Sequence, residues 1–103
     1  MKRGTQIAYI PDHANGDLDH PDVEAGFVTS WREGDQAAYC RYWSKVNPDE
    51  LRTKANSELT PCRYLEEIDS CPQWRVDAEL EKIDSQSREA TERFVSWLNG
   101  ELP

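Results

Sequence analysis

Residues 26–43 have the sequence GFVTSWREGDQAAYCRYW, and this stretch carries the strongest structural signal in the chain. Both of its ends are rich in aromatic side chains, and the first also carries the β-branched Val28 and Thr29; both kinds of side chain are typical of strands. Arg32-Glu33-Gly34-Asp35 lies between them and is expected to turn, because Gly34 can adopt a positive φ. The stretch therefore predicts an antiparallel hairpin of strands 26–31 and 37–43.

Alternation assigns the faces of this hairpin. Side chains two residues apart along a strand share a face, and a barrel strand turns one face toward the core. In the first strand, Phe27, Thr29 and Trp31 share one face. In the second strand Ala38, Cys40 and Tyr42 alternate with Tyr39, Arg41 and Trp43.

Shorter strand signals flank the hairpin. Residues 6–10 form a first strand closed by Pro11, and residues 51–55 are expected to form a fourth. Glu58-Leu59-Thr60 follows a turn, and Thr60-Pro61 has the pattern of a helix cap, which predicts a short helical turn over residues 62–67. Four or five short strands with polar turns predict a small SH3-like β-barrel over residues 1–68.

Residues 69–103 differ in character and are expected to form one long amphipathic helix, from about residue 74 to residue 99. Apolar or small side chains recur there at spacings of four and three, which is the period of one helix face. The helix would be roughly 39 Å long, whereas the barrel would be roughly 25 Å across. Part of the helix should therefore extend beyond the barrel and need a partner. The stripe consists of Val76, Leu80, Ile83, Ser87, Ala90, Phe94 and Trp97.

The chain is strongly acidic, with a formal net charge of -8 at pH 7 among 103 residues. This charge argues against direct binding of nucleic acid and of anionic membranes, and it favours a protein partner with a basic surface. No apolar run is long enough to span a bilayer, and the start lacks a signal-peptide core. Three cysteines without a C-x-x-C pair suit reduced thiols, so we expect a cytoplasmic protein.

Several segments resemble known proteins. Residues 7–14, His20-Pro21-Asp22 and residues 24–30 are similar to the opening of small uncharacterised phage and prophage proteins. The Gly26-x-Val28 strand resembles the second strand of SH3-like barrels of the Tudor and KOW kind, and residues 57–65 resemble the strand and helical turn that close them. The resemblance covers residues 5–68 and implies a mobile-element origin, with host cytoplasm as the location. It supplies no catalytic or binding residue, and the chain lacks the basic loops with which KOW-type barrels hold nucleic acid.

The loop at residues 11–24 contains His13 and His20 among aspartates, and two interpretations of it remain open. Imidazole and carboxylate suit zinc or manganese, but the spacing matches no standard zinc or calcium pattern. The second interpretation is a solvated loop held by Asx-turns. We expect no metal and no other cofactor.

The acidic residues concentrate in two zones. Residues 12–35 carry seven acids against one base, and residues 66–92 carry nine acids against three bases. Such zones could imitate a phosphate track, as in inhibitors of the anti-CRISPR or anti-restriction type that occupy nucleic-acid sites. The simpler alternative is that charge covers the surface of a small domain.

Aromatic side chains offer one further alternative, a groove that binds peptides or methylated cations. Its members would be Trp31, Trp43, Tyr39, Tyr9 and Tyr42, although aromatics in so small a barrel also form its core. Catalysis has little support, because Cys40 and Cys62 have no nearby His and the chain has no Gly-x-Ser-x-Gly or phosphate-binding glycine loop.

The sequence therefore predicts a non-enzymatic protein-interaction module that binds through the acidic loop and the helix. A nucleic-acid-mimicking inhibitor is the alternative, and a homodimer through the helix is a further expectation. The predicted contact residues are Asp12, His13, Asp17, Asp19, His20, Asp22, Trp31, Trp43, Phe94 and Trp97.

Overall fold

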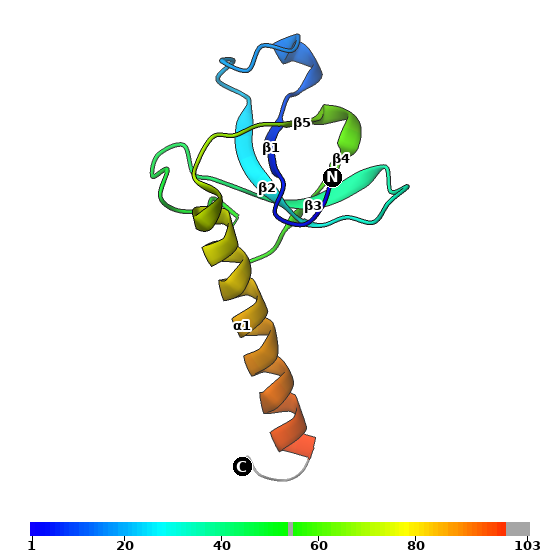
Figure 1. Ribbon diagram of the computed structural model, residues 1–103, viewed down its shortest axis with the longest axis vertical. Helices are drawn as coiled ribbons and strands as arrows, with labels where there is room; N and C mark the ends of the chain where they lie inside the picture. The colour runs from blue at the N-terminus through cyan, green and yellow to red at the C-terminus, as the bar shows by residue number, and fades with distance from the viewer. Residues whose placement is uncertain (54, 99–103) are drawn as a thin grey trace. The chain divides into compact units, whose positions relative to one another are not determined.

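The computed structural model describes residues 1–53 and 55–98, with side chains described as far as residue 88. The chain divides into two compact units, Met1–Pro72 and Gln73–Pro103. The first unit is a curled antiparallel sheet of five strands in the order β4-β3-β2-β1-β5 (Figure 1). Its elements are β1 (Gln6–Tyr9), the 3-10 helix η1 (Asp12–Ala14), β2 (Glu24–Ser30), β3 (Ala37–Tyr42), β4 (Glu58–Pro61), the 3-10 helix η2 (Cys62–Tyr64) and β5 (Leu65–Glu67).

The predicted hairpin is confirmed as β2 and β3. Val28 pairs with Cys40 and Gly26 with Tyr42, and the amide of Asp35 donates to the carbonyl of Arg32 in the turn. In β3, Ala38, Cys40 and Tyr42 are buried and Tyr39 is exposed, as the alternation predicts, but Arg41 and Trp43 are buried as well. Ala38, Cys40 and Tyr42 form the core together with Ile7 and Val28.

The predicted face of β2 does not continue along the strand. Phe27 and Val28 are both fully buried, and the Phe27 ring lies against Trp43 with 5.6 Å between centroids. Trp31 instead packs against the cluster that contains Val28. The register of β2 and β3 shifts between Val28 and Ser30, and such a bulge moves the following side chains to the other face.

The prediction of a fourth strand at residues 51–55 is wrong for the described residues of that segment, 51–53 and 55. Leu51 makes one isolated bridge with Trp43, and the Thr53 hydroxyl accepts a hydrogen bond from the amide of Tyr42. The segment therefore supplies hydrogen-bond partners to the end of β3 without pairing with it as a strand. The strand beside β3 is β4, in which Thr60 pairs with Ala38.

The helical turn predicted at residues 62–67 is confirmed only in its first half. Residues 62–64 form η2, but residues 65–67 form β5, which pairs with β1 through Tyr9 and Leu65. Thr60 does not cap η2, because its hydroxyl is hydrogen-bonded to the Tyr42 hydroxyl at 2.7 Å. A buried tyrosine that needs a polar partner accounts for this choice.

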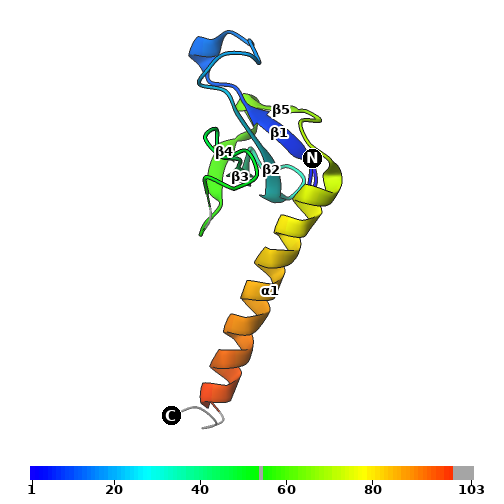
Figure 2. The same cartoon turned by 90° about the vertical axis from the view of Figure 1, so that its left-hand side faces the viewer.

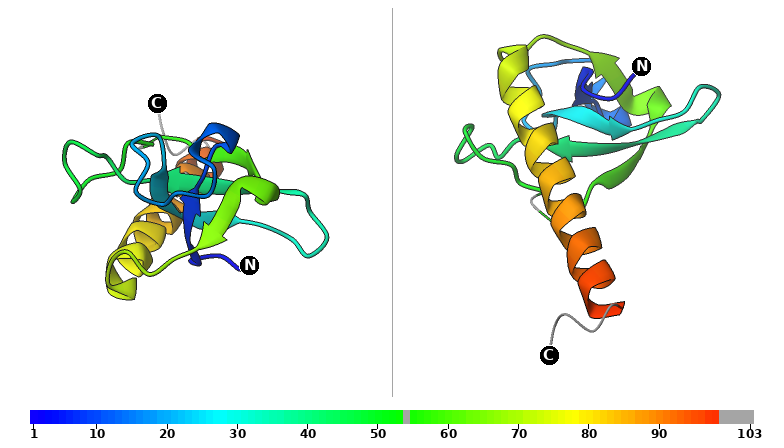
Figure 3. Two further views of the ribbon diagram at one scale, coloured as in Figure 1. Left: turned by 90° about the horizontal axis from the view of Figure 1, so that it is seen from above. Right: turned by 60° about the horizontal axis from the view of Figure 1, so that its bottom comes forward.

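The second unit contains α1 (Gln73–Leu98), one continuous helix of 26 residues (Figure 3). This agrees with the predicted helix to within one residue at each end. In the parts of the chain that the structure describes, no helix combines the length and the apolar character needed to cross a bilayer. The side chains of Phe94 and Trp97 lie outside the described residues.

Candidate functional site

The loop between β1 and β2 extends past the ends of both strands (Figure 2). It is a series of tight turns closed by backbone hydrogen bonds from the amides of Ala14, Asp17, His20 and Val23 to carbonyls three residues earlier. Asn15 and Gly16 have positive φ values of 53° and 76°, which Asn and Gly tolerate. The side chain of Ala14 is buried and anchors the loop. The loop is therefore an ordered platform for its polar side chains.

Three of these side chains converge. His13 Nε2 lies 2.6 Å from Asp22 Oδ2, and the rings of His13 and His20 meet edge to face with 5.2 Å between centroids. The amide of Asp22 donates to His20 Nδ1 at 3.0 Å, which orients the second ring. The hydrogen bond from His13 is the main reason that the pKa of Asp22 is lowered, and the charges of both histidines and Lys45 add to the effect. We call these three residues the His/Asp cluster.

The other predicted contact residues of this loop are three aspartates. Asp12, Asp17 and Asp19 are exposed, and among the described residues Asp17 and Asp19 form no ion pair. The loop therefore presents negative charge to solvent, as the sequence predicted.

A second feature lies on the sheet beside this loop. Tyr9, Tyr42 and Tyr64 line a pocket with a volume of about 280 Å³, and Glu24, Glu58, Leu59, Thr60 and Pro61 complete its wall. The ring of Tyr9 meets those of Tyr42 and Tyr64 edge to face, with centroids 6.5 Å and 5.8 Å apart. We call this feature the tyrosine pocket. Tyr64 also lines a neighbouring recess with Asp12 and Gly16 of the loop, so the two features adjoin.

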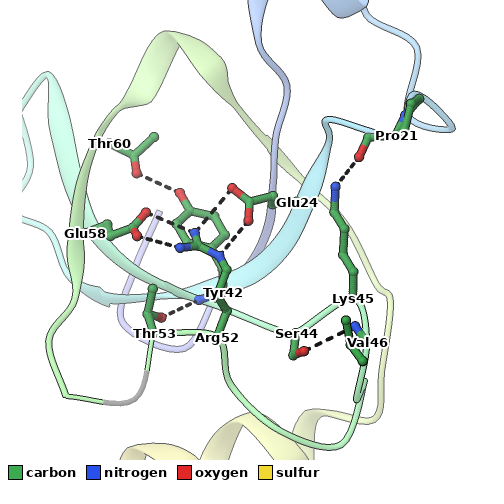
Figure 4. Close-up of polar contacts among 10 residues, drawn as sticks. All are labelled: Pro21, Glu24, Tyr42, Ser44, Lys45, Val46, Arg52, Thr53, Glu58 and Thr60. Atoms are coloured by element: carbon green, nitrogen blue, oxygen red, sulfur yellow. Dashed lines mark hydrogen bonds and ion pairs between the residues drawn. The ribbon is translucent and has the colours of Figure 1, made fainter.

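Two arginines of the chain lie over rings that line the tyrosine pocket. The guanidinium of Arg52 lies 5.6 Å from the centroid of the Tyr42 ring and bridges Glu24 and Glu58 (Figure 4). Its hydrogen bond with Glu58, followed by the charges of both glutamates, raises the pKa of Arg52. Arg63 lies over the Tyr64 ring at 4.7 Å and donates to the Tyr64 hydroxyl. Cations above tyrosine faces with carboxylates beside them define the chemistry of this surface.

The aromatic groove expected from the sequence is only partly assembled. Tyr9 and Tyr42 meet in the tyrosine pocket, but Trp43 is buried against Phe27, Trp31 packs on the core and Tyr39 is about half exposed elsewhere. Trp43 is 8% exposed, and Tyr42, which lines the pocket, is 1% exposed. Sequence reasoning missed Tyr64, because only the pairing of β5 with β1 brings it to Tyr9.

Comparison with known proteins gives no family. No family model, no curated protein and no solved structure matches this chain.

Proposed function

We propose that this chain is a non-enzymatic protein-interaction module that binds a basic segment of a partner protein. The observation that carries the proposal is the tyrosine pocket, whose lining contains three tyrosine rings and two glutamates that pair with Arg52. Tyrosine faces and carboxylates both attract guanidinium and ammonium groups. The positions of Arg52 and Arg63 over two of the three rings support this preference.

The acidic loop would extend the contact beyond the pocket. The exposed carboxylates of Asp12, Asp17 and Asp19 lie on the segment that adjoins the pocket through Tyr64. Charges at the rim of an interface mainly speed association and select partners, whereas desolvated aromatics contribute most of the affinity. The loop is therefore proposed to guide the partner and the pocket to hold it.

The apolar stripe of α1 remains a second proposed contact surface, including a homodimer through Phe94 and Trp97. Sedimentation analysis of the whole chain and of Trp97→Ala tests it. A strictly monomeric chain whose Trp97→Ala variant binds its partner normally would rule the helix out as an interface.

We also propose the finer fold, an SH3-like barrel, and an origin in a phage or prophage. The strand order β4-β3-β2-β1-β5 and the 3-10 turn between the last two strands support the fold. The origin rests on the sequence resemblance alone.

Titration of the isotopically labelled chain with a Lys/Arg-rich peptide, followed by amide NMR, tests the proposed function. We expect shifts concentrated at Tyr9, Glu24, Tyr64 and residues 12–22. Affinity should fall by about tenfold between about 0.05 M and 0.5 M NaCl, because salt screens exposed charges.

Two tyrosine variants form a matched pair for this experiment. Tyr64→Ala removes one of the three rings that line the pocket and should weaken binding by about fivefold or more, which is the scale of one cation–π contact. Tyr39→Ala removes an exposed ring outside the pocket and should change binding by less than about twofold. Equal binding of a Glu-rich peptide, or an equal loss in both variants, would contradict the proposal.

The alternative function is a nucleic-acid-mimicking inhibitor of a host defence or nucleic-acid-binding protein. It is favoured by one observation, the exposed carboxylates of Asp17 and Asp19, which form no ion pair among the described residues. Competition between the chain and a DNA fragment for a basic DNA-binding protein tests it. A mimic should displace the DNA at low salt, and Asp17→Asn/Asp19→Asn should lose that effect. If the chain displaced the DNA equally well at low and high salt, mimicry would be excluded.

A further inference from the structure

We infer that the His/Asp cluster is a zinc site, formed by His13, His20 and Asp22. One nitrogen of each ring and one carboxylate oxygen all lie within 4.8 Å of one another. Tetrahedral zinc with bonds of about 2.0–2.2 Å places its ligand atoms roughly 3.4 Å apart. The ligand atoms therefore lie near that spacing, and the side chains that carry them are exposed or half-buried.

The donor set selects the class of metal. Two imidazoles and one carboxylate suit zinc and other divalent transition ions better than calcium or magnesium, which prefer oxygen ligands alone. Three protein ligands leave a fourth position for water or for a side chain of a partner. The sequence did not predict this site because its spacing, with six residues between the histidines and one before Asp22, matches no standard zinc pattern.

The backbone of the loop holds the three residues in place before any metal binds. His13 lies in η1, whose first backbone bond runs from the amide of Ala14 to the carbonyl of Pro11. The amide of His20 donates to the carbonyl of Asp17, which fixes the second histidine. Lys45 contacts the carbonyl of Pro21 between His20 and Asp22, and so ties this part of the loop to the segment after β3 (Figure 4). Such preorganisation favours binding because less freedom is lost on coordination.

Two features of the loop act on a bound cation in opposite directions. The exposed carboxylates of Asp12, Asp17 and Asp19 raise the local concentration of cations, while the ammonium of Lys45 repels them. Coordination by His20 also replaces one hydrogen bond, since a neutral ring whose Nδ1 accepts from the Asp22 amide carries its proton on Nε2. Without metal, His20 should therefore be the Nε2-H tautomer, and zinc should change its ring nitrogen signals.

Calorimetric titration of the full, tag-free chain with zinc chloride at neutral pH tests the inference. The titration should be repeated in a chain that carries Cys62→Ser and Cys71→Ser, because these two partly exposed thiols are alternative zinc ligands. We expect one zinc per chain, with the His13 and His20 ring nitrogens shifting together in NMR.

Variants in the same loop distinguish the effect of losing a zinc ligand from the effect of losing a negative charge. His13→Ala, His20→Ala and Asp22→Asn should each weaken binding by about tenfold or more, since each removes one of three ligands. Asp19→Asn makes the same charge change outside the cluster and should weaken binding by less than about threefold. Circular dichroism of every variant should match the parent.

Two results would overturn the inference. One is the absence of zinc binding at about millimolar free metal, which would leave His13 and Asp22 as a hydrogen-bonded pair only. The other is zinc binding that persists in His13→Ala/His20→Ala. Neither result bears on the tyrosine pocket, so the proposed function is tested separately.

Discussion

Gly26 is the residue at which the hairpin tolerates no side chain. A methyl group there would lie 2.1 Å from the carbonyl oxygen of Arg41 and 2.9 Å from Cδ1 of Tyr42. The first of these atoms is backbone and cannot rotate away. The sheet therefore depends on glycine at this position for close approach of β2 and β3 rather than for a positive φ.

Gly26→Ala should therefore destabilise the chain by about 1–3 kcal/mol, the usual cost of an overpacked interior. Urea unfolding followed by tryptophan fluorescence measures the loss. Ser30→Ala, an exposed change in the same strand, is the control and should stay within about 0.5 kcal/mol of the parent. Equal stability of the Gly26→Ala and parent chains would show that the strands can separate to admit the methyl group.

Cys40 is a second residue whose burial has a measurable consequence. Removal from water raises the pKa of its thiol from 9.0 to about 11, because burial disfavours the thiolate. The folded chain then holds a proton that the unfolded chain releases above pH 9. Stability from this group is complete below pH 9 and is lost as the pH rises from 9 to 11.

The loss at high pH should reach roughly 2–3 kcal/mol, since one pKa unit corresponds to about 1.4 kcal/mol. Urea unfolding at pH 8 and pH 10.5 should show the parent losing more stability than Cys40→Ala. Burial raises the pKa of Tyr42 as well, so part of the slope should remain in the variant. Identical slopes in the two chains would contradict this assignment.

Among the elements, the segment after β5 is held by one side chain of β1. Gln6 is 5% exposed, and its Oε1 accepts from the amides of Ser70 and Cys71 while its Nε2 donates to the carbonyl of Cys71. The amide of Ile68 also donates to the carbonyl of Gln6. The backbone pairing of β1 with β5 ends at Glu67. Beyond it, the side chain of Gln6 supplies the hydrogen bonds that hold the next residues.

Gln6→Ala should cost about 1–3 kcal/mol, because it leaves partly buried amides without acceptors. Hydrogen exchange should accelerate first at Ser70 and Cys71. Gln36→Ala removes an exposed glutamine side chain and serves as the control, with little change expected. Unchanged exchange at residues 70 and 71 in Gln6→Ala would mean that other contacts fix this segment.

For the whole molecule, the net charge of -8 is the dominant electrostatic fact. Like charges repel most in the compact state, and the ion pairs of Arg52 with Glu24 and Glu58 offset only part of this repulsion. Salt should therefore stabilise the chain, by roughly 0.5–1 kcal/mol between about 0.05 M and 0.5 M NaCl.

Thermal unfolding by circular dichroism at the two salt concentrations checks this expectation. Asp17→Asn/Asp19→Asn should unfold at a higher temperature than the parent in low salt and should respond less to added salt. A fall in stability with salt would instead show that the ion pairs outweigh the repulsion.

The hairpin and the helix were predictable because their signals are local. Alternation over residues 37–43 and the spacing of apolar residues over 76–97 express the geometry of one strand or one helix, and no distant contact is needed to interpret them. The exposed acidic loop was predictable for the same reason, since Pro, Asn-Gly and Asp act on their own neighbours.

Strand pairing determined the rest. Residues 51–53 and 58–61 both had strand character, and only the second pairs with β3. The pairing of β1 with β5 brought Tyr64 to Tyr9, and the tight turns of the loop brought His20 and Asp22 to His13. These arrangements depend on contacts between separate segments. The free energy of such contacts comes from burial and hydrogen bonding across the sheet and the loop rather than from local propensity. The spacing of residues along the sequence therefore does not predict such contacts.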